Sequence, residues 1–374
     1  MNKVAICLIV VCFLVSALAM PVSFGATTLS ASQSIAMSGV IINTDFGFQM
    51  RGASVSIEAF TLGAINYQPN AWQLLKEANI NTICVWGGIN GDIAHFNINN
   101  YPNEWAQNLN NFLSAADQNG IKVYFGQLGN AYGTLFGIVS PGDTGSGPYS
   151  ATPLAQAEAM IDRLAGINSL GHNFINDSRV VGWRTSNEVD ISNSTVLNWN
   201  LQLCDYIRSK GGKVWLSSPY FAGANDFSLT EPLLQGHVDY LETHKYLIPQ
   251  FISSGMNYAT YYDVWNSILM SEEQSLGNFS PSEVILGEFG IWNGIGSDMG
   301  LTNVTFTDAE RAVYYQAVFD AAAAAGIQNI MLFKFFAQKD SDGAVLAPNY
   351  GVVDANGSFY PYILNIIQNA YSSG

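Results

Sequence analysis

The sequence predicts an α/β protein with the (β/α)8 barrel fold, preceded by a short N-terminal β-hairpin. Apolar runs typical of buried strands recur eight times along the chain, and helical segments separate most of them. Several of these runs end at polar side chains. Alternating strands and helices favour a parallel sheet, and eight such units favour a closed barrel over an open sheet.

The hairpin is predicted over residues 40–49, with Asn43-Thr-Asp-Phe-Gly47 as its turn. The strands that follow are recognised as short apolar runs bounded by turn or helix signals. In chain order the predicted strands are 48–54, 81–86, 121–128, 180–185, 213–217, 238–243, 283–287 and 329–335.

The helices between these strands are recognised by capping residues and by apolar spacing. Thr152-Pro153 begins one helix, because proline is favoured in the first turn. Thr307 and Glu310 have the spacing of a capping box and begin another. The predicted helices cover 69–79, a segment opening at 103–105, another opening at 152–153, then 195–210, 258–276, 307–326 and 361–370.

Residues 1–26 have the pattern of a secretory signal peptide. Lys3 supplies the positive end, residues 4–19 are apolar, and small residues follow. We therefore expect a secreted protein with no membrane attachment after cleavage. An uncleaved anchor is the alternative, because no charged residue lies between Lys3 and Asp45.

Composition favours a large globular domain. The chain has 374 residues, of which 48% are hydrophobic and 11% charged. That is enough for one large domain or two small ones, and since no linker or repeat divides the chain, residues 27–374 are assigned to a single (β/α)8 domain. The formal net charge of −15 would repel a phosphate backbone and argues against nucleic acid as a partner. A neutral polysaccharide is compatible with this charge, and nothing in the sequence specifies an oligomeric state.

Metal and cofactor chemistry are not indicated. After signal cleavage only Cys84 and Cys204 remain, both in apolar runs, and we expect two buried free thiols. The sequence has no zinc-protease motif, no nucleophile elbow and no glycine-rich nucleotide loop. We predict no metal site and no cofactor.

Polar residues follow several predicted strands at their carboxyl ends, where a barrel of this kind carries its active site. Strands four and seven lie nearly opposite each other on the rim, so Glu188 and Glu288 are expected to face each other. The polar or aromatic residues at the ends of strands two, three, four, six and seven are Trp86, Asn90, Gln127, Asn130, Asn187, Glu188, His244, Tyr246 and Glu288.

Two facing carboxyl groups can hydrolyse a glycosidic bond, one as a proton donor and the other as the attacking carboxylate. Asn187 is placed to bind the sugar hydroxyl next to the reacting carbon, and Tyr246 to orient the attacking carboxylate. The rings of Trp86, Trp183 and Trp292 are candidate flat faces for pyranose rings. Each residue alone has a structural alternative, as a rim ion pair, a buried histidine or a core ring; the joint pattern favours catalysis.

Several segments resemble the clan A glycoside hydrolases, and most closely family 5 in its endo-β-1,4-mannanase branch. The fourth-strand segment VVGWRTSNEVD is similar to that family's Trp-Glu-x-x-Asn-Glu-Pro, and VILGEFG to its seventh strand. The resemblance implies Glu188 as acid/base and Glu288 as nucleophile, with retention of configuration. It also implies substrate contacts from Asn130, His244 and an aromatic residue after strand eight, here Phe335. The other matching segments are MRGAS, NTICVWGGIN, IKVYFGQLGNAYG and VDYLETHKYL.

The chain also departs from the family pattern. Cys84 stands where the second strand usually has an arginine that supports the nucleophile, and Arg184 stands where the pattern has a glutamate. Val189 replaces the proline after the acid/base, and LFKFFAQ replaces the usual eighth-strand tryptophan with Phe335 or Phe336. Lys334 and Arg51 are candidates to supply the missing positive charge.

We therefore expect a secreted, retaining endo-glycosidase acting on a β-1,4-linked polysaccharide, with mannan favoured. Three alternatives remain: an endo-β-1,4-glucanase, an exo-acting β-glycosidase on the same barrel, and a catalytically inactive carbohydrate-binding barrel.

Overall fold

The computed structural model describes residues 48–87, 98, 101–126, 135–143, 150–166, 171–217, 226–253, 255 and 257–372. The proposed signal peptide and nearly all of the predicted hairpin lie outside these residues, as do Asn90, Gln127 and Asn130. Within the described part of the chain, no helix is both long and apolar enough to cross a membrane.

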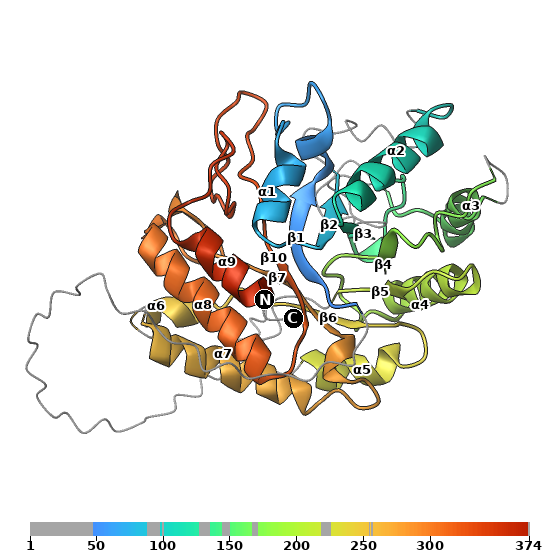
Figure 1. The fold of residues 1–374 in the computed structure, drawn as a ribbon. Coiled ribbons are helices and arrows are strands. Elements are labelled where there is room, and N and C mark those ends of the chain that lie inside the picture. The colour runs from blue at the N-terminus through green and yellow to red at the C-terminus, as the bar shows by residue number, and fades with distance from the viewer. Residues whose placement is uncertain are drawn as a thin grey trace, which may run out of the picture. The chain divides into compact units, whose positions relative to one another are not determined.

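Eight parallel strands form the barrel, in the spatial order β5-β4-β3-β2-β1-β10-β7-β6 (Figure 1). A parallel bridge between Ser217, just after β5, and Glu242 in β6 joins the two ends of this order. The predicted (β/α)8 fold and all eight predicted strands are confirmed. The strands are β1 (Arg51–Ser56), β2 (Thr82–Trp86), β3 (Lys122–Phe125), β4 (Val180–Arg184), β5 (Val214–Trp215), β6 (Leu241–His244), β7 (Val284–Phe289) and β10 (Asn329–Leu332).

Helices surround the strands (Figure 1). Asn193 caps α4 by accepting hydrogen bonds from the backbone of Thr195 and Val196, and Thr307 forms the predicted capping box with Glu310 at the start of α8. The helices are α1 (Ala71–Glu77), α2 (Trp105–Gln118), α3 (Leu154–Leu164), α4 (Ser194–Ser209), α5 (Asp226–Leu234), α6 (Ile248–Ser253), α7 (Tyr258–Glu273), α8 (Asp308–Ala324) and α9 (Ile363–Ser372).

The sequence did not predict α5, α6 or the antiparallel hairpin of β8 (Gly294–Gly296) and β9 (Val304–Phe306). The hairpin occupies the connection between β7 and α8. These are short elements, and α5 contains Pro232, which weakens the helical signal.

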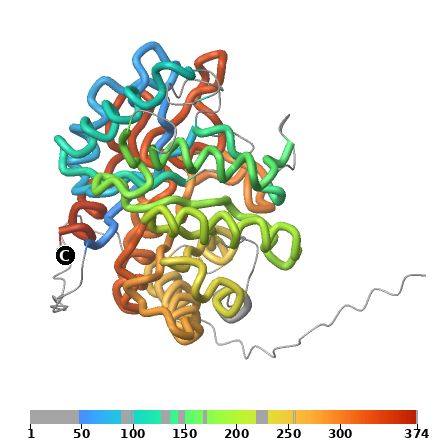
Figure 2. Tube along the Cα trace, turned by 90° about the vertical axis from the view of Figure 1, so that its right-hand side faces the viewer, coloured from blue at the N-terminus to red at the C-terminus, as the bar shows by residue number. Residues whose placement is uncertain are grey.

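The strands are buried because side chains fill the barrel and helices cover its outer face. Every residue of β6, β7 and β10 is buried. The last helix lies beside the first strand (Figure 2), where Tyr371 donates a hydrogen bond to the carbonyl of Gly52 at 3.0 Å. Cys84 and Cys204 are buried free thiols, as predicted. The core thus holds the strand ends in fixed positions.

Candidate active site

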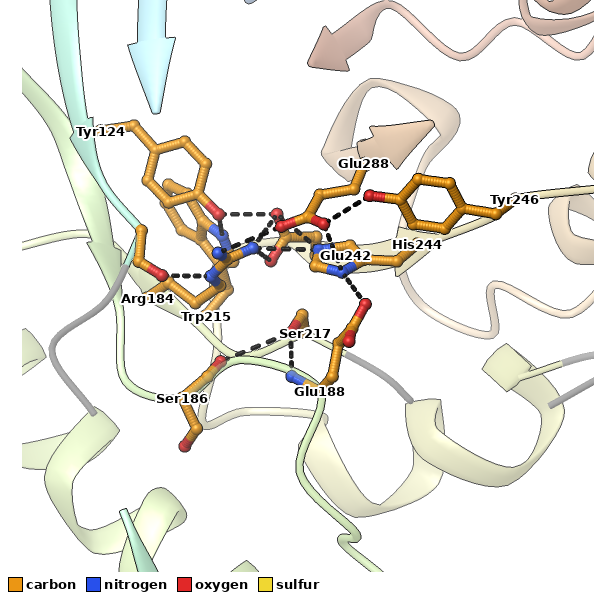
Figure 3. A network of polar contacts seen from close by, with 11 residues as sticks. Tyr124, Arg184, Ser186, Glu188, Trp215, Ser217, Glu242, His244, Tyr246 and Glu288 are labelled. Carbon is orange, nitrogen blue, oxygen red and sulfur yellow. Dashed lines mark hydrogen bonds and ion pairs between the residues drawn. The ribbon is translucent and has the colours of Figure 1, made fainter. Parts of the chain in front are cut away.

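Glu188 and Glu288 approach each other at the carboxyl ends of the strands. Glu288 lies within β7, and Glu188 lies in the turn that follows β4. One oxygen of each carboxyl group and a ring nitrogen of His244 all lie within 4.8 Å of one another. Figure 3 shows His244 between the two carboxyl groups. The chain therefore brings together two acidic groups that are 100 positions apart in sequence.

Both carboxyl groups reach solvent. The side chain of Glu188 is 22% exposed, and that of Glu288 is 11% exposed. A hydrolytic pair must be open to substrate and water, yet sufficiently buried for neighbouring groups to control its protonation. The exposed fractions of both side chains meet the first condition.

Three groups hold the Glu288 carboxylate. The Tyr246 hydroxyl donates a hydrogen bond to Oε2 at 2.8 Å. His244 Nδ1 lies 3.7 Å from Oε2, and Arg184 Nη2 lies 3.7 Å from Oε1. The pKa of Glu288 is raised: burial is the largest cause and the charge of Glu188 adds to it, whereas His244, Arg184 and Tyr246 act in the opposite direction without reversing the shift. These three groups therefore favour the ionised form that a nucleophile requires.

Glu188 is held by its backbone as well as by its side chain. Its φ angle is +52°, a conformation that residues other than glycine seldom adopt and that often occurs at functional sites. Its backbone N–H donates to Ser217 Oγ at 2.6 Å, which links the turn to the end of β5 (Figure 3). Its Oε1 lies 2.6 Å from His244 Nδ1.

The contacts of His244 favour a proton on its Nδ1 atom. Burial opposes its charged form, but Glu288, Glu188 and Glu242 outweigh burial and raise the pKa of His244 to about 10. Arg184 Nη1 lies 3.0 Å from His244 Nε2. Arginine can only donate, so this contact favours a neutral ring with Nε2 as acceptor. The raised pKa favours a charged ring, whereas the contact with Arg184 favours a neutral one. In either charge state Nδ1 is the protonated nitrogen that faces Glu188.

Two buried polar atoms at the carboxyl ends of the strands are unpaired. Asn187 Oδ1 and Trp86 Nε1 are buried, and neither has a hydrogen-bond partner among the described residues. Buried polar groups are nearly always paired, so an unpaired atom at the strand ends is a candidate contact for a ligand. Asn187 adjoins Glu188, and Trp86 is the last residue of β2. Both atoms are suited to bind sugar hydroxyls.

Three aromatic residues proposed from sequence as sugar contacts lie in the core instead. Trp183 is fully buried and stacks on Phe125 with ring centroids 4.7 Å apart. Trp292 is fully buried and donates to the carbonyl of Val304 at 3.0 Å. Phe335 is also fully buried, packed against other phenylalanine rings. None of these rings offers an exposed face in this structure.

Phe333 is an aromatic residue of the site that the sequence reasoning missed. It directly follows β10, is partly exposed, and meets the ring of Tyr246 edge-on with centroids 5.9 Å apart. The segment LFKFFAQ contains three phenylalanines, and only the exact end of the strand distinguishes Phe333 from Phe335. Asn130, also predicted as a sugar contact, lies outside the described residues.

The two cations proposed to replace the second-strand arginine differ in position. Arg51 donates to the carbonyl of Tyr371 at 2.7 Å, at the amino end of β1, so it does not support Glu288. Lys334 Nζ lies 5.1 Å from the centre of the Trp86 ring and donates to Gln338 Oε1. Burial lowers the pKa of Lys334 to about 8, although Glu288 and Glu58 act in the opposite direction.

Glu188, His244 and Glu288 are also a group of described residues that could hold a cation. A metal ion at this place would have to displace the proton between His244 Nδ1 and Glu188 Oε1, which are 2.6 Å apart. Hydrolysis by a carboxyl pair does not require a metal.

Comparison with known proteins identifies the fold. No protein-family model matches the sequence, and no curated protein matches it either. A family 2 β-galacturonidase from Eisenbergiella tayi bound to galacturonate is similar in structure, with 14% identity and a TM-score of 0.55 over 87% of this chain and 51% of that chain. The β-glucuronidase of Faecalibacterium prausnitzii has 15% identity and a TM-score of 0.57 over 87% and 49%.

A family 5 mannosidase from Rhizomucor miehei is also similar, with 12% identity and a TM-score of 0.56 over 87% of this chain and 93% of that chain. The chain thus spans about half the length of the galacturonidase and glucuronidase that it matches, and nearly all of the mannosidase. At these identities the similarity establishes the barrel fold alone.

Proposed function

We propose that this protein is a retaining glycoside hydrolase. The proposal rests on one observation: an oxygen of Glu188 and an oxygen of Glu288 lie within 4.8 Å of each other at the carboxyl ends of the strands. Retaining enzymes hold their two carboxyl groups about 5–5.5 Å apart, whereas inverting enzymes need about 6.5–9.5 Å to admit a water molecule. The short separation favours direct attack by one carboxylate.

In the proposed mechanism, Glu288 attacks the anomeric carbon while Glu188 donates a proton to the departing glycosidic oxygen. The glycosidic bond breaks and a glycosyl ester of Glu288 forms. Glu188, now ionised, takes a proton from water, whose oxygen attacks the anomeric carbon and releases Glu288. Tyr246 orients the nucleophile through its 2.8 Å hydrogen bond to Glu288. His244 holds the acid/base through the 2.6 Å contact between its Nδ1 atom and Glu188 Oε1.

The proposed substrate is a neutral β-1,4-linked polysaccharide, with mannan first and β-glucan second, and the protein is proposed to be secreted. Support comes from the partly exposed ring of Trp86, from the unpaired Asn187 Oδ1, and from a net charge that favours a neutral polymer over an acidic one. The similarity in fold to a family 5 mannosidase over nearly its whole length is consistent with this choice.

The test is incubation with mannan, carboxymethyl cellulose and xylan, followed by measurement of reducing ends and product lengths. We expect endo-type products from mannan, initially with retained configuration by proton NMR. Glu288→Ala should abolish release of reducing ends and keep the fold, whereas Glu77→Ala, an exposed glutamate of α1, should act like the wild type. Binding without product release would instead identify an inactive carbohydrate-binding barrel.

A further inference from the structure

Glu288 lacks the positive charge that the resembled family places on the second strand. Cys84 occupies that position in β2, and burial raises the pKa of its thiol to about 12. The thiol is therefore uncharged at ordinary pH and cannot offset the burial of Glu288. Other strands must supply the charge if Glu288 is to act as a carboxylate, and His244 of β6, with Nδ1 3.7 Å from Oε2, supplies part of it.

Arg184, the last residue of β4, supplies a guanidinium group beside Glu288. Its Nη1 and Nη2 atoms contact Glu242, His244 and Glu288 (Figure 3). Nε donates to the carbonyl of Gly126 at 2.6 Å, and Nη1 donates to both oxygens of Glu242 at 3.1 and 3.2 Å. Nη2 lies 3.7 Å from Glu288 Oε1. The planar donor fork of arginine suits this arrangement, whereas the single ammonium of lysine does not.

Glu242 fixes the guanidinium from the opposite side. It lies in β6, fully buried, and also accepts a hydrogen bond from the Tyr124 hydroxyl at 2.6 Å. Burial raises its pKa, but the charges of Arg184 and His244 and the hydrogen bonds from His244 and Tyr124 outweigh burial and lower the pKa to about 2. Glu242 is thus an anion under working conditions, and it holds Arg184 without competing for the substrate.

Two glycines leave room for the Arg184–Glu242 ion pair. A Cβ atom at Gly287, the residue before Glu288, would lie 2.0 Å from Glu242 Oε1. A Cβ atom at Gly126 would lie 2.3 Å from Cys84 Sγ and 3.2 Å from Arg184 Nη2. The side chains of Cys84 and Arg184 therefore both lie next to Gly126, although they come from different strands.

We propose that Arg184, anchored by Glu242, is the positioning residue that supports the Glu288 nucleophile, in place of the second-strand arginine that Cys84 replaces. In this arrangement the supporting cation comes from β4 rather than β2, and the anion that anchors the cation comes from β6. This inference rests on the proposed function, because it assigns Glu288 the role of nucleophile.

The test compares Arg184→Met and the double variant Arg184→Met/Glu242→Gln with the wild type. The double variant leaves no unpaired buried charge, so it stays informative if the single variant does not fold. Because Arg184 favours the ionised form of Glu288, its loss should move the acidic limb of the kcat–pH profile upward by about one unit. At acidic pH kcat should fall about tenfold or more, with little change in KM.

A relocation variant provides the matched control. The double variant Cys84→Arg/Arg184→Cys returns the cation to β2. The acidic limb of its kcat–pH profile should lie nearer to the wild-type limb than the limb of Arg184→Cys alone does. Carbon-13 NMR titration of labelled glutamate, with Glu288→Gln to assign the signal, should show the same ordering of the Glu288 pKa without any substrate.

Two outcomes would overturn the inference: folded Arg184→Met variants with an unchanged acidic limb and an unchanged Glu288 titration, or a relocation variant no different from Arg184→Cys. If the proposed function itself were wrong, the result would be different, because the wild type would then release no sugar from any substrate.

Discussion

The backbone N–H of Glu188 is hydrogen-bonded to Ser217 Oγ at 2.6 Å, so the end of β5 fixes the position of a residue that follows β4. This bond holds Glu188 in its left-handed conformation, with φ of +52°. Ser217 is fully buried and does not touch the nucleophile. It therefore acts through the orientation of Glu188.

We expect Ser217→Ala to lower kcat about tenfold, with little change in KM and a loss of about 1 kcal/mol in unfolding free energy, typical of one hydrogen bond. Steady-state kinetics and urea unfolding would measure both effects. Ser209→Ala is the control, because it removes an exposed serine hydrogen bond in α4. A Ser217→Ala enzyme with wild-type kcat would show that the turn holds without this bond.

The two glutamates should respond differently to the leaving group. Glu188→Ala removes the proton donor, which matters for a poor leaving group such as a sugar alcohol and much less for an acidic phenol. We expect this variant to lose activity on polysaccharide and keep much of it on an aryl glycoside, whereas Glu288→Ala should lose both. Release of the aryl group, followed by absorbance, separates the two cases. Equal losses in the two variants would contradict the assigned roles.

Gly287→Ala should damage the site although residue 287 contacts no substrate. The added Cβ would lie 2.0 Å from Glu242 Oε1, and Glu242 cannot easily move because Arg184 and Tyr124 hold it. Disrupting a buried ion pair costs about 3–5 kcal/mol, so we expect a loss of this size in urea unfolding, with most activity lost.

Gly63→Ala is the comparison for that variant. Gly63 has a φ of +88° and open space around it, so only the backbone penalty applies, about 1–2 kcal/mol. If both variants lost the same stability, the close contact with Glu242 would not be the cause.

Much of this architecture was predictable from sequence, because each barrel strand is a local apolar run between helix signals. Glu188 and Glu288 were predictable as partners, since strands four and seven of an eight-stranded barrel face each other. Phe335 was the ring chosen for the eighth strand's end, but β10 ends at Leu332, Phe335 is fully buried, and Phe333 is the partly exposed ring beside Tyr246. A shift of two residues in a strand end decides which ring is exposed.

The role of Arg184 was not predictable from local sequence. Its replacement of a glutamate was visible, but its partners Glu242 and Glu288 lie 58 and 104 positions further along the chain. Side-chain direction inside a barrel depends on strand register, which the sequence pattern does not specify. The sequence indicated Lys334 and Arg51 as the supporting cations because they neighbour strand ends, whereas Arg184 belongs to β4 itself, as its last residue.

The Glu242 carboxylate should make the free energy of unfolding depend on pH in the acidic range. Its folded pKa is about 2, against an ordinary value of 4.5. Because the folded pKa is the lower one, ionised Glu242 contributes stability that is fully present above about pH 4.5 and is lost as the pH falls toward 2. We expect the advantage of the wild type over Glu242→Gln in urea unfolding to be constant from pH 7 to about 5, and to shrink below that.

Glu273→Gln, in the last turn of α7, is the control and should follow the wild type throughout. A difference between wild type and Glu242→Gln that stayed constant down to about pH 2.5 would mean that Glu242 does not bind Arg184 as an anion, and the support of Glu288 would need another source.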